Sequence, residues 1–345
     1  MNETLQRPQI AAQPKAADEI IALDSMVGGM GDIWMRLSAI YTLAALVPDR
    51  KIQLRIPKSL VRIAQQVWPD RFLITDSTLS NPIEITHLGI RHIAGRLITG
   101  GQFLTPFYQI QRADRKVTSF KHRLNDILVQ TAKLGADFFI PTAASVNCYQ
   151  GYHECSAIKV FSKVPYDKFL AQAAEDFVIT RSRMQTLWPK SETPTWRVVV
   201  LPSGTGHQVM PPDWARDILP DATYVFFGRD SYKAEFASRG LRIEEFDSVD
   251  SLLKIAAQAR FAVVTDSFPS HPLQTYSAAT VVALSQQPRS RIVHPAFDGP
   301  VVQSRAECCP CANRARGIGR CDAGLDFCTT WSNFQYRQEL HSILS

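Results

Sequence analysis

A glycine-rich turn that ends in an acid provides the first residues with a possible chemical role. The segment from Gly28 to Asp32 follows an apolar run at residues 19–25 and precedes apolar residues at helical spacing over 33–47. Glycines between a strand and a helix let the backbone and its free amides, near Gly31, approach a ligand closely. Two interpretations of Asp32 are possible: it is the N-cap of this helix, or it is a general base at the carboxyl end of a parallel strand.

A second group of small polar residues follows another apolar run, at residues 261–265. Asp266 and Ser267 stand where this strand ends, and His271 lies in the first turn of the helix expected next. Short polar side chains and helix-start amides at a strand end form a natural site for phosphate. The plainer reading is that Asp266 or Ser267 caps the helix and that His271 lies on the surface.

The apolar run at residues 197–201 leads into a loop that contains Ser203, Thr205 and Gly206. Such a loop is able to hold a phosphate through its backbone amides, although it is also compatible with a plain connection.

Five of the seven cysteines lie close together near the end of the chain, from Cys308 to Cys328. Four of them have the spacing C-x2-C-x9-C-x6-C, and these are Cys308, Cys311, Cys321 and Cys328. Four thiolates in one short loop can hold a structural zinc or iron, and reduced cysteines without metal are the alternative. The polar first 18 residues lack the apolar segment of a signal peptide, which indicates a cytosolic protein with reduced thiols.

The net charge of +6 is modest and unevenly distributed. The segment from residue 91 to 123 contains seven Lys and Arg residues, Arg91, Arg96 and Arg112 among them, and only one acidic residue. This basic segment either attracts a phosphorylated or acidic partner or forms an ordinary solvated surface. No nucleic-acid-binding module is present, so we expect no nucleic-acid partner. No apolar run is long enough to span a membrane, which leaves peripheral contact at most.

Strand and helix patterns alternate on both sides of a polar, proline-containing stretch at residues 187–196. This alternation predicts an α/β protein with parallel sheets covered by helices. We expect a disordered leader at 1–18, a first domain at 19–186, a second domain at 197–331 with a cysteine loop at 308–328, and a last helix at 332–345. The pattern gives no clear assignment from residue 90 to about 166.

Taken together, these segments resemble the family 9 glycosyltransferases, the ADP-heptose transferases of lipopolysaccharide assembly. The resemblance rests on the strand, the turn ending in Gly31-Asp32 and the helix, followed much later by Asp266-Ser267-x-x-x-His271, a strand and the cysteine loop. It runs at intervals from about residue 19 to 331. It implies a GT-B fold, in which two Rossmann-like domains face each other across a cleft, with the acceptor on the N-terminal side and the nucleotide sugar on the C-terminal side.

The resemblance also implies roles for single residues. Asp32 is expected to be the catalytic base, and the residues expected to bind the nucleotide sugar are Gly31, Ser203, Thr205, Gly206, Asp266, Ser267 and His271. The basic residues Arg91, Arg96 and Arg112 would suit a phosphorylated acceptor. No cofactor is expected for the chemical step, because GT-B enzymes generally need no divalent metal there. Two departures stand out: no lysine follows the 203–207 loop, and Phe268 replaces a glycine.

The expected activity is inverting transfer of a sugar, most simply heptose from an ADP-sugar, to a hydroxyl of lipopolysaccharide core. One alternative is a protein O-heptosyltransferase, since relatives of that kind carry a cysteine-bound metal and form oligomers. The other is a non-catalytic binding protein that keeps the GT-B frame. The acceptor is therefore a glycolipid or a protein, and a homo-oligomer is compatible with either.

Overall fold

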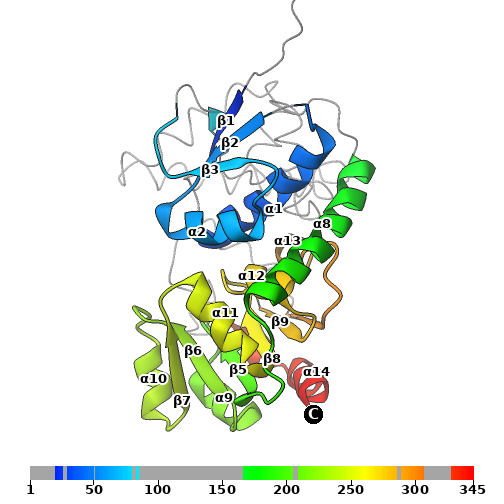
Figure 1. The fold of residues 1–345 in the computed structure, drawn as a ribbon. Helices are drawn as coiled ribbons and strands as arrows, with labels where there is room; N and C mark the ends of the chain where they lie inside the picture. Colours follow the sequence, from blue (N-terminus) through cyan, green and yellow to red (C-terminus); the bar gives the residue numbers. More distant parts are fainter. Residues whose placement is uncertain are drawn as a thin grey trace, which may run out of the picture.

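The chain folds into two α/β lobes, each built on a parallel sheet, and one long helix connects them (Figure 1). The computed structural model describes residues 20–25, 29–49, 51–79, 83–84, 166–204, 209–285, 289–306 and 328–345. The predicted α/β class with two Rossmann-like sheets is confirmed within these residues.

The first lobe contains a parallel four-stranded sheet with the strand order β3-β2-β1-β4. Its elements are β1 (Ile20–Asp24), α1 (Met30–Leu46), β2 (Lys51–Arg55), α2 (Lys58–Val67), β3 (Leu73–Thr75) and β4 (Ile83–Glu84). Helix α1 ends at Leu46, with Val47 as its C-cap, because Pro48 cannot continue the backbone hydrogen bonds of a helix. Most of α1 is buried, so it lies at the centre of the structure and not on its surface.

The second lobe contains a parallel six-stranded sheet with the order β10-β9-β8-β5-β6-β7. Its strands are β5 (Trp196–Leu201), β6 (Thr223–Phe227), β7 (Arg242–Phe246), β8 (Ala259–Thr265), β9 (Thr280–Leu284) and β10 (Val301–Gln303). Strand β9 is buried along its whole length, as expected for a parallel sheet with both faces covered. The helices of this lobe are α9 (Pro212–Ile218), α10 (Lys233–Ser238), α11 (Val249–Ala257), α12 (Ser270–Tyr276), α13 (Arg289–Ile292) and α14 (Phe334–Leu344).

Helix α8 (Tyr166–Leu187) packs against α1 of the first lobe and against α12 of the second. The sequence patterns do not identify this helix, because its buried stripe includes the polar residues Asp176 and Thr180 while Val178 and Ile179 are exposed. The two lobes share an apolar core, since one buried cluster includes residues of α1, α2, α8, α11 and α12. The lobes are therefore packed together, not merely tethered.

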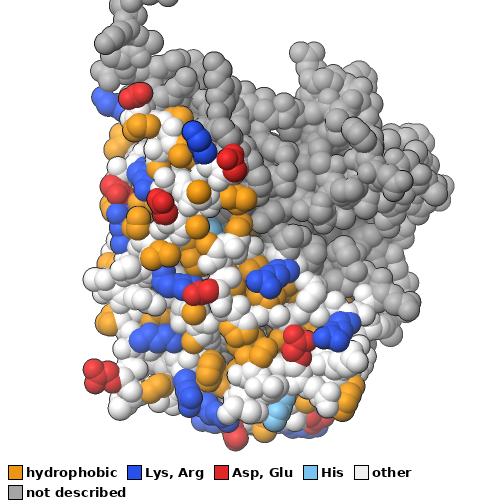
Figure 2. Space-filling view, turned by 90° about the vertical axis from the view of Figure 1, so that its right-hand side faces the viewer, with side chains coloured by type: hydrophobic (Ala, Val, Ile, Leu, Met, Phe, Trp, Pro, Cys, Tyr) orange, Lys and Arg blue, Asp and Glu red, His pale blue; other side chains and the backbone are white. Residues whose placement is uncertain are grey.

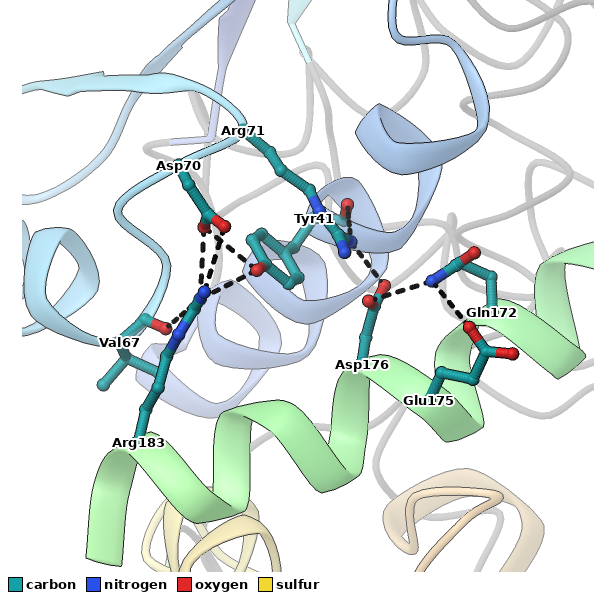
Figure 3. A network of polar contacts seen from close by, with 8 residues as sticks. All are labelled: Tyr41, Val67, Asp70, Arg71, Gln172, Glu175, Asp176 and Arg183. Carbon is teal, nitrogen blue, oxygen red and sulfur yellow. Dashed lines mark hydrogen bonds and ion pairs between the residues drawn. The ribbon is translucent and has the colours of Figure 1, made fainter. Parts of the chain in front are cut away.

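A network of charged side chains attaches α8 to the first lobe (Figure 3). Arg183 of α8 makes two hydrogen bonds to Asp70, and Tyr41 of α1 donates to the same carboxylate. Nearer the start of α8, the buried carboxylate of Asp176 pairs with Arg71 of the first lobe at 2.7 Å. Burial alone would raise the pKa of Asp70, but the hydrogen bonds from Arg183 and Tyr41 outweigh burial and hold the pKa below its usual value.

On its other side, α8 is attached to the second lobe by equally polar contacts. Arg181 donates to the carbonyl oxygens of Gln274 and Thr275 at the end of α12, and pairs with both carboxylate oxygens of Asp298. Gln185 donates to the carbonyl of Tyr276 at 3.0 Å. Because α12 follows directly from the β8 strand end, α8 fixes α12 relative to α1.

The buried ion pair of α8 predicts a measurable loss of stability in a variant. Asp176→Ala leaves the partly buried Arg71 guanidinium without its carboxylate, which should lower the free energy of unfolding by about 2 kcal/mol. The neighbouring Glu175→Ala, at an exposed position, should change it by less than about 0.5 kcal/mol. Urea unfolding of both variants tests the pair, and equal effects would contradict its role.

A second prediction concerns His294, which stacks on Phe177 of α8 with ring centroids 4.3 Å apart. Burial, helped by the nearby Arg181, lowers the pKa of this imidazole to about 3. The unfolded chain binds a proton at an ordinary histidine pKa near 6.5, so stability should fall as the pH drops from about 6.5 toward 3.

The limiting slope for one such group is about 1.4 kcal/mol per pH unit. We therefore expect the stability difference between wild type and His294→Asn to shrink by about 2 kcal/mol between pH 7.5 and pH 5. Urea unfolding of both proteins at the two pH values measures this change. A difference that is the same at both pH values would show that His294 takes up its proton as readily in the folded protein as in the unfolded chain.

Candidate active site

The candidate site residues of the first lobe lie where its strand order reverses. Strand β1 has β2 on one side and β4 on the other, and the chain passes through β2 and β3 before it returns to β4, so the strand order reverses at β1. Ligands of open parallel α/β sheets bind at such switch points, outside the carboxyl ends of the strands. Helix α1, which carries Gly31 and Asp32, begins at this place.

Asp32 lies in the first turn of α1 but does not occupy the N-cap position, which belongs to Gly29. Its Oδ2 accepts a hydrogen bond from the Gly29 backbone N–H at 3.0 Å. The carboxylate therefore satisfies one of the helix-start amides from inside the helix, where the positive end of the helix dipole also favours a negative charge. The Asp32 side chain is only half buried, so part of it is exposed.

The second lobe has its switch point between β5 and β8. Ser203 follows β5 and is partly exposed there, whereas Thr205 and Gly206 lie outside the described residues. Asp266 and Ser267 follow β8, directly beside Ser203's strand. The sequence-predicted residues of both strand ends thus come together at the place where a ligand is expected.

Asp266 and Ser267 have different surroundings despite being neighbours. Asp266 is almost fully buried, and its Oδ1 accepts a hydrogen bond from Ser285 Oγ at the end of β9, at 3.0 Å. The carbonyl of Ser267 accepts hydrogen bonds from the backbone N–H and the hydroxyl of Ser270. These contacts form a tight turn between β8 and α12.

The two lobes meet at Gly31 and His271. A Cβ atom at Gly31 would lie 2.8 Å from Cδ2 and 2.9 Å from Nε2 of the His271 ring, closer than carbon atoms can pack. His271 itself is mostly buried. The first turn of α1, with Asp32 next in sequence, therefore lies directly against the turn that follows β8.

Phe268 follows Ser267 in this turn and is partly buried. The side chain packs against the shared apolar core, and its Cα lies 3.5 Å from the position of a Gly31 Cβ. The replacement of a glycine by phenylalanine is thus accommodated by the core on this side of the turn.

Two residues near the site were not identified from the sequence. Arg36, one turn after Asp32, is almost fully buried, and its Nε donates to the Asp32 carbonyl at 3.2 Å. Ser285 is the hydrogen-bond donor to Asp266. The spacing of four residues between Asp32 and Arg36 was an available signal, since such pairs share a helix face. No local pattern connects Ser285 with Asp266, because only the pairing of β8 with β9 brings them together.

Several predicted site residues lie outside the described part of the chain: Arg91, Arg96, Arg112, Thr205, Gly206, Cys308, Cys311 and Cys321. Of the predicted metal ligands only Cys328 is described. Its Sγ contacts Thr330 Oγ1 at 3.3 Å and the Ser285 carbonyl oxygen at 3.8 Å. Among the described residues, no group of three or more His, Cys, Asp or Glu side chains is arranged to hold a metal ion. A metal in the cysteine segment stays a prediction.

The surface agrees with the modest overall charge. On the face shown in Figure 2, the described Lys and Arg side chains are scattered among acidic and apolar ones and form no single patch. Within the described ranges, no helix is both long and apolar enough to cross a membrane.

Comparison with known proteins gives matches among solved structures. The chain is similar to a glycosyl transferase family 9 structure from Veillonella parvula, with a TM-score of 0.50, 11% identity, and coverage of 94% of this chain and 97% of that one. This comparison shows a shared fold over nearly the whole chain, which confirms the expected GT-B architecture. No protein-family model and no curated protein matches.

Two Escherichia coli structures are also similar, at lower TM-scores. Heptosyltransferase WaaC with ADP has a TM-score of 0.46 and 13% identity, covering 83% of this chain and 93% of that one. ADP-heptose lps heptosyltransferase II has a TM-score of 0.43 and 11% identity, covering 95% and 98%.

The contact between Gly31 and His271 predicts a change of sign in a mutant cycle. In the wild type, Gly31→Ala should lower the free energy of unfolding by about 1–2 kcal/mol, because the new methyl group clashes with the ring. In a His271→Ala background the same change should stabilise by up to about 1 kcal/mol, because alanine favours a helix. Urea unfolding of the four proteins measures the cycle. The same sign in both backgrounds would mean that this contact is absent in solution.

Proposed function

We propose that the protein is an inverting glycosyltransferase that moves a sugar from a nucleoside-diphosphate sugar to a hydroxyl group. The observation that carries the proposal is the position of Asp32. Its half-buried carboxylate stands at the switch point of the first sheet and next to Gly31, which touches the His271 turn at the switch point of the second sheet. The proposed base on one lobe is thus next in sequence to the residue that contacts the candidate phosphate site on the other.

In the proposed reaction, Asp32 removes the proton of the acceptor hydroxyl while the oxygen of that hydroxyl forms a bond to the anomeric carbon. The bond from that carbon to the phosphate oxygen breaks, and its electron pair leaves with the nucleoside diphosphate. Attack from the side opposite the leaving group inverts the anomeric configuration. The hydrogen bond from the Gly29 amide leaves Asp32 held in one orientation, which suits a general base.

The donor would lie at the carboxyl ends of β5 and β8. Ser203 and Ser267 offer hydroxyl and backbone groups at these ends, and His271 is the neighbouring side chain that touches the first lobe. Groups fixed in advance around a developing diphosphate charge stabilise the transition state most effectively. The donor that we propose is ADP-heptose, on the sequence resemblance to family 9 glycosyltransferases, and the proposed chemistry needs no metal ion.

The proposed acceptor is a hydroxyl of lipopolysaccharide core. The basic residues Arg91, Arg96 and Arg112 are the proposed contacts for its phosphate groups, because guanidinium groups bind phosphate in a bidentate manner. A protein hydroxyl is the alternative acceptor, and both enter the assay below.

The base can be tested with a variant that keeps its hydrogen bond. Asp32→Asn retains an oxygen acceptor for the Gly29 amide but cannot take a proton, so turnover should fall by about 10²- to 10⁴-fold. The measurement is release of ADP from ADP-heptose with lipopolysaccharide core and protein acceptors. The affinity for ADP should stay within about threefold, because nucleotide binding does not require the base.

Asp49→Asn is the matched control, since Asp49 is exposed beyond the opposite end of α1 and should leave turnover unchanged. Equal turnover in the Asp32→Asn variant and the wild type would exclude Asp32 as the base. A wild type that binds ADP without any turnover over the donors and acceptors tried would favour the non-catalytic alternative.

A further inference from the structure

The buried carboxylate of Asp266 is the starting point for an inference about a residue outside the proposed site. Only 1% of Asp266 is exposed, so the carboxylate is removed from the solvent that would otherwise hydrate it. A buried carboxylate requires hydrogen-bond donors from the protein. Ser285, equally buried at the end of the neighbouring strand β9, donates one from its Oγ at 3.0 Å.

Ser285 is itself held in place from behind. Its carbonyl oxygen accepts hydrogen bonds from Thr330 Oγ1 at 3.1 Å and, more weakly, from Cys328 Sγ. Thr330 is completely buried and also contacts the hydroxyl of Ser304, which follows β10. The backbone of Ser285 is therefore held by the segment that contains Cys328 and Thr330, and its hydroxyl is left to donate to Asp266.

Asp266 in turn begins the connection that leads to His271. The turn is closed by hydrogen bonds from Ser270 to the Ser267 carbonyl and from the His271 N–H to the Phe268 carbonyl. With Asp266 anchored to β9 at one end and the turn closed at the other, the His271 ring has a defined position against Gly31. A shift at Asp266 would be passed along this short connection to the ring.

We propose that Ser285 is a positioning residue, which holds Asp266 and through it places His271 at the boundary with the first lobe. This inference rests on the proposed function for its consequence, namely that the donor site needs His271 in this place. In this role Asp266 anchors the turn and does not itself contact the ligand. Ser285 acts only through Asp266 and touches no substrate.

The test compares full-length wild type with Ser285→Ala and Ser285→Cys. The cysteine variant fills nearly the same volume but donates only a weak hydrogen bond, so it separates lost bonding from lost packing. Two quantities are measured: the NMR resonances of the His271 ring, assigned with His271→Gln, and the Kd of ADP. In both variants we expect the His271 resonances to shift and the Kd of ADP to rise by up to about tenfold, because displacement of His271 passes part of the energy of the lost Ser285–Asp266 hydrogen bond to the donor site.

Ser277→Ala is the matched control. Ser277 is a buried serine at the far end of α12, where its hydroxyl accepts a hydrogen bond from the Ala279 N–H. This variant loses a comparable hydrogen bond of the same helix but has no contact with Asp266. It should leave the His271 resonances at their wild-type positions and the Kd of ADP within about twofold of the wild type.

The possible outcomes separate the two proposals. Unchanged His271 resonances in both Ser285 variants overturn the positioning role, and so do equal changes in the Ser277→Ala control. Shifted resonances with an unchanged Kd of ADP overturn the link to the donor site. A wild type that does not bind ADP overturns the proposed function, while the resonances still decide whether Ser285 positions His271.

Discussion

The first turn of α1 packs against the His271 ring so closely that a methyl group at Gly31 would overlap it. This contact determines how near the switch points of the two sheets can come, and it places Asp32 beside the second lobe. A larger residue at position 31 would separate the carboxylate from the strand ends of β5 and β8. The chemistry that we propose for Asp32 therefore depends on the absence of a side chain at its neighbour, because only that absence allows the approach.

The contact persists because the elements on either side of it are held by other interactions. Helix α1 is buried between the first sheet, α8 and α12, and its core is continuous with that of the second lobe. The charged pairs of α8 with Asp70, Arg71 and Asp298 add directional contacts on both sides. Hydrophobic packing supplies the attraction between lobes, while these pairs select one angle between them.

The sequence patterns locate most of the described strands and helices, because parallel strands such as β5 and β9 are continuous apolar runs between helical patterns. They do not reveal α8, whose buried face contains Asp176 and Thr180 and whose exposed face contains Val178. The strand-end positions of Asp32 and Asp266 follow from the same patterns. The burial of Asp266 and its bond with Ser285 do not, since they depend on the pairing of β8 with β9. Patterns within a segment thus predict elements, whereas contacts between segments require the fold.

Helix α8 belongs to neither half of the chain alone. It precedes the second sheet in sequence, pairs with Asp70 of the first lobe and supports the end of α12 in the second. In a chimaera of two related proteins joined in the polar stretch after α8, Arg181 would lie against the α12 of the other protein. An exchange joined before α8 would leave Arg183 facing an unfamiliar Asp70 region. A working chimaera would therefore need a first lobe and an α12 that both match the two faces of this helix.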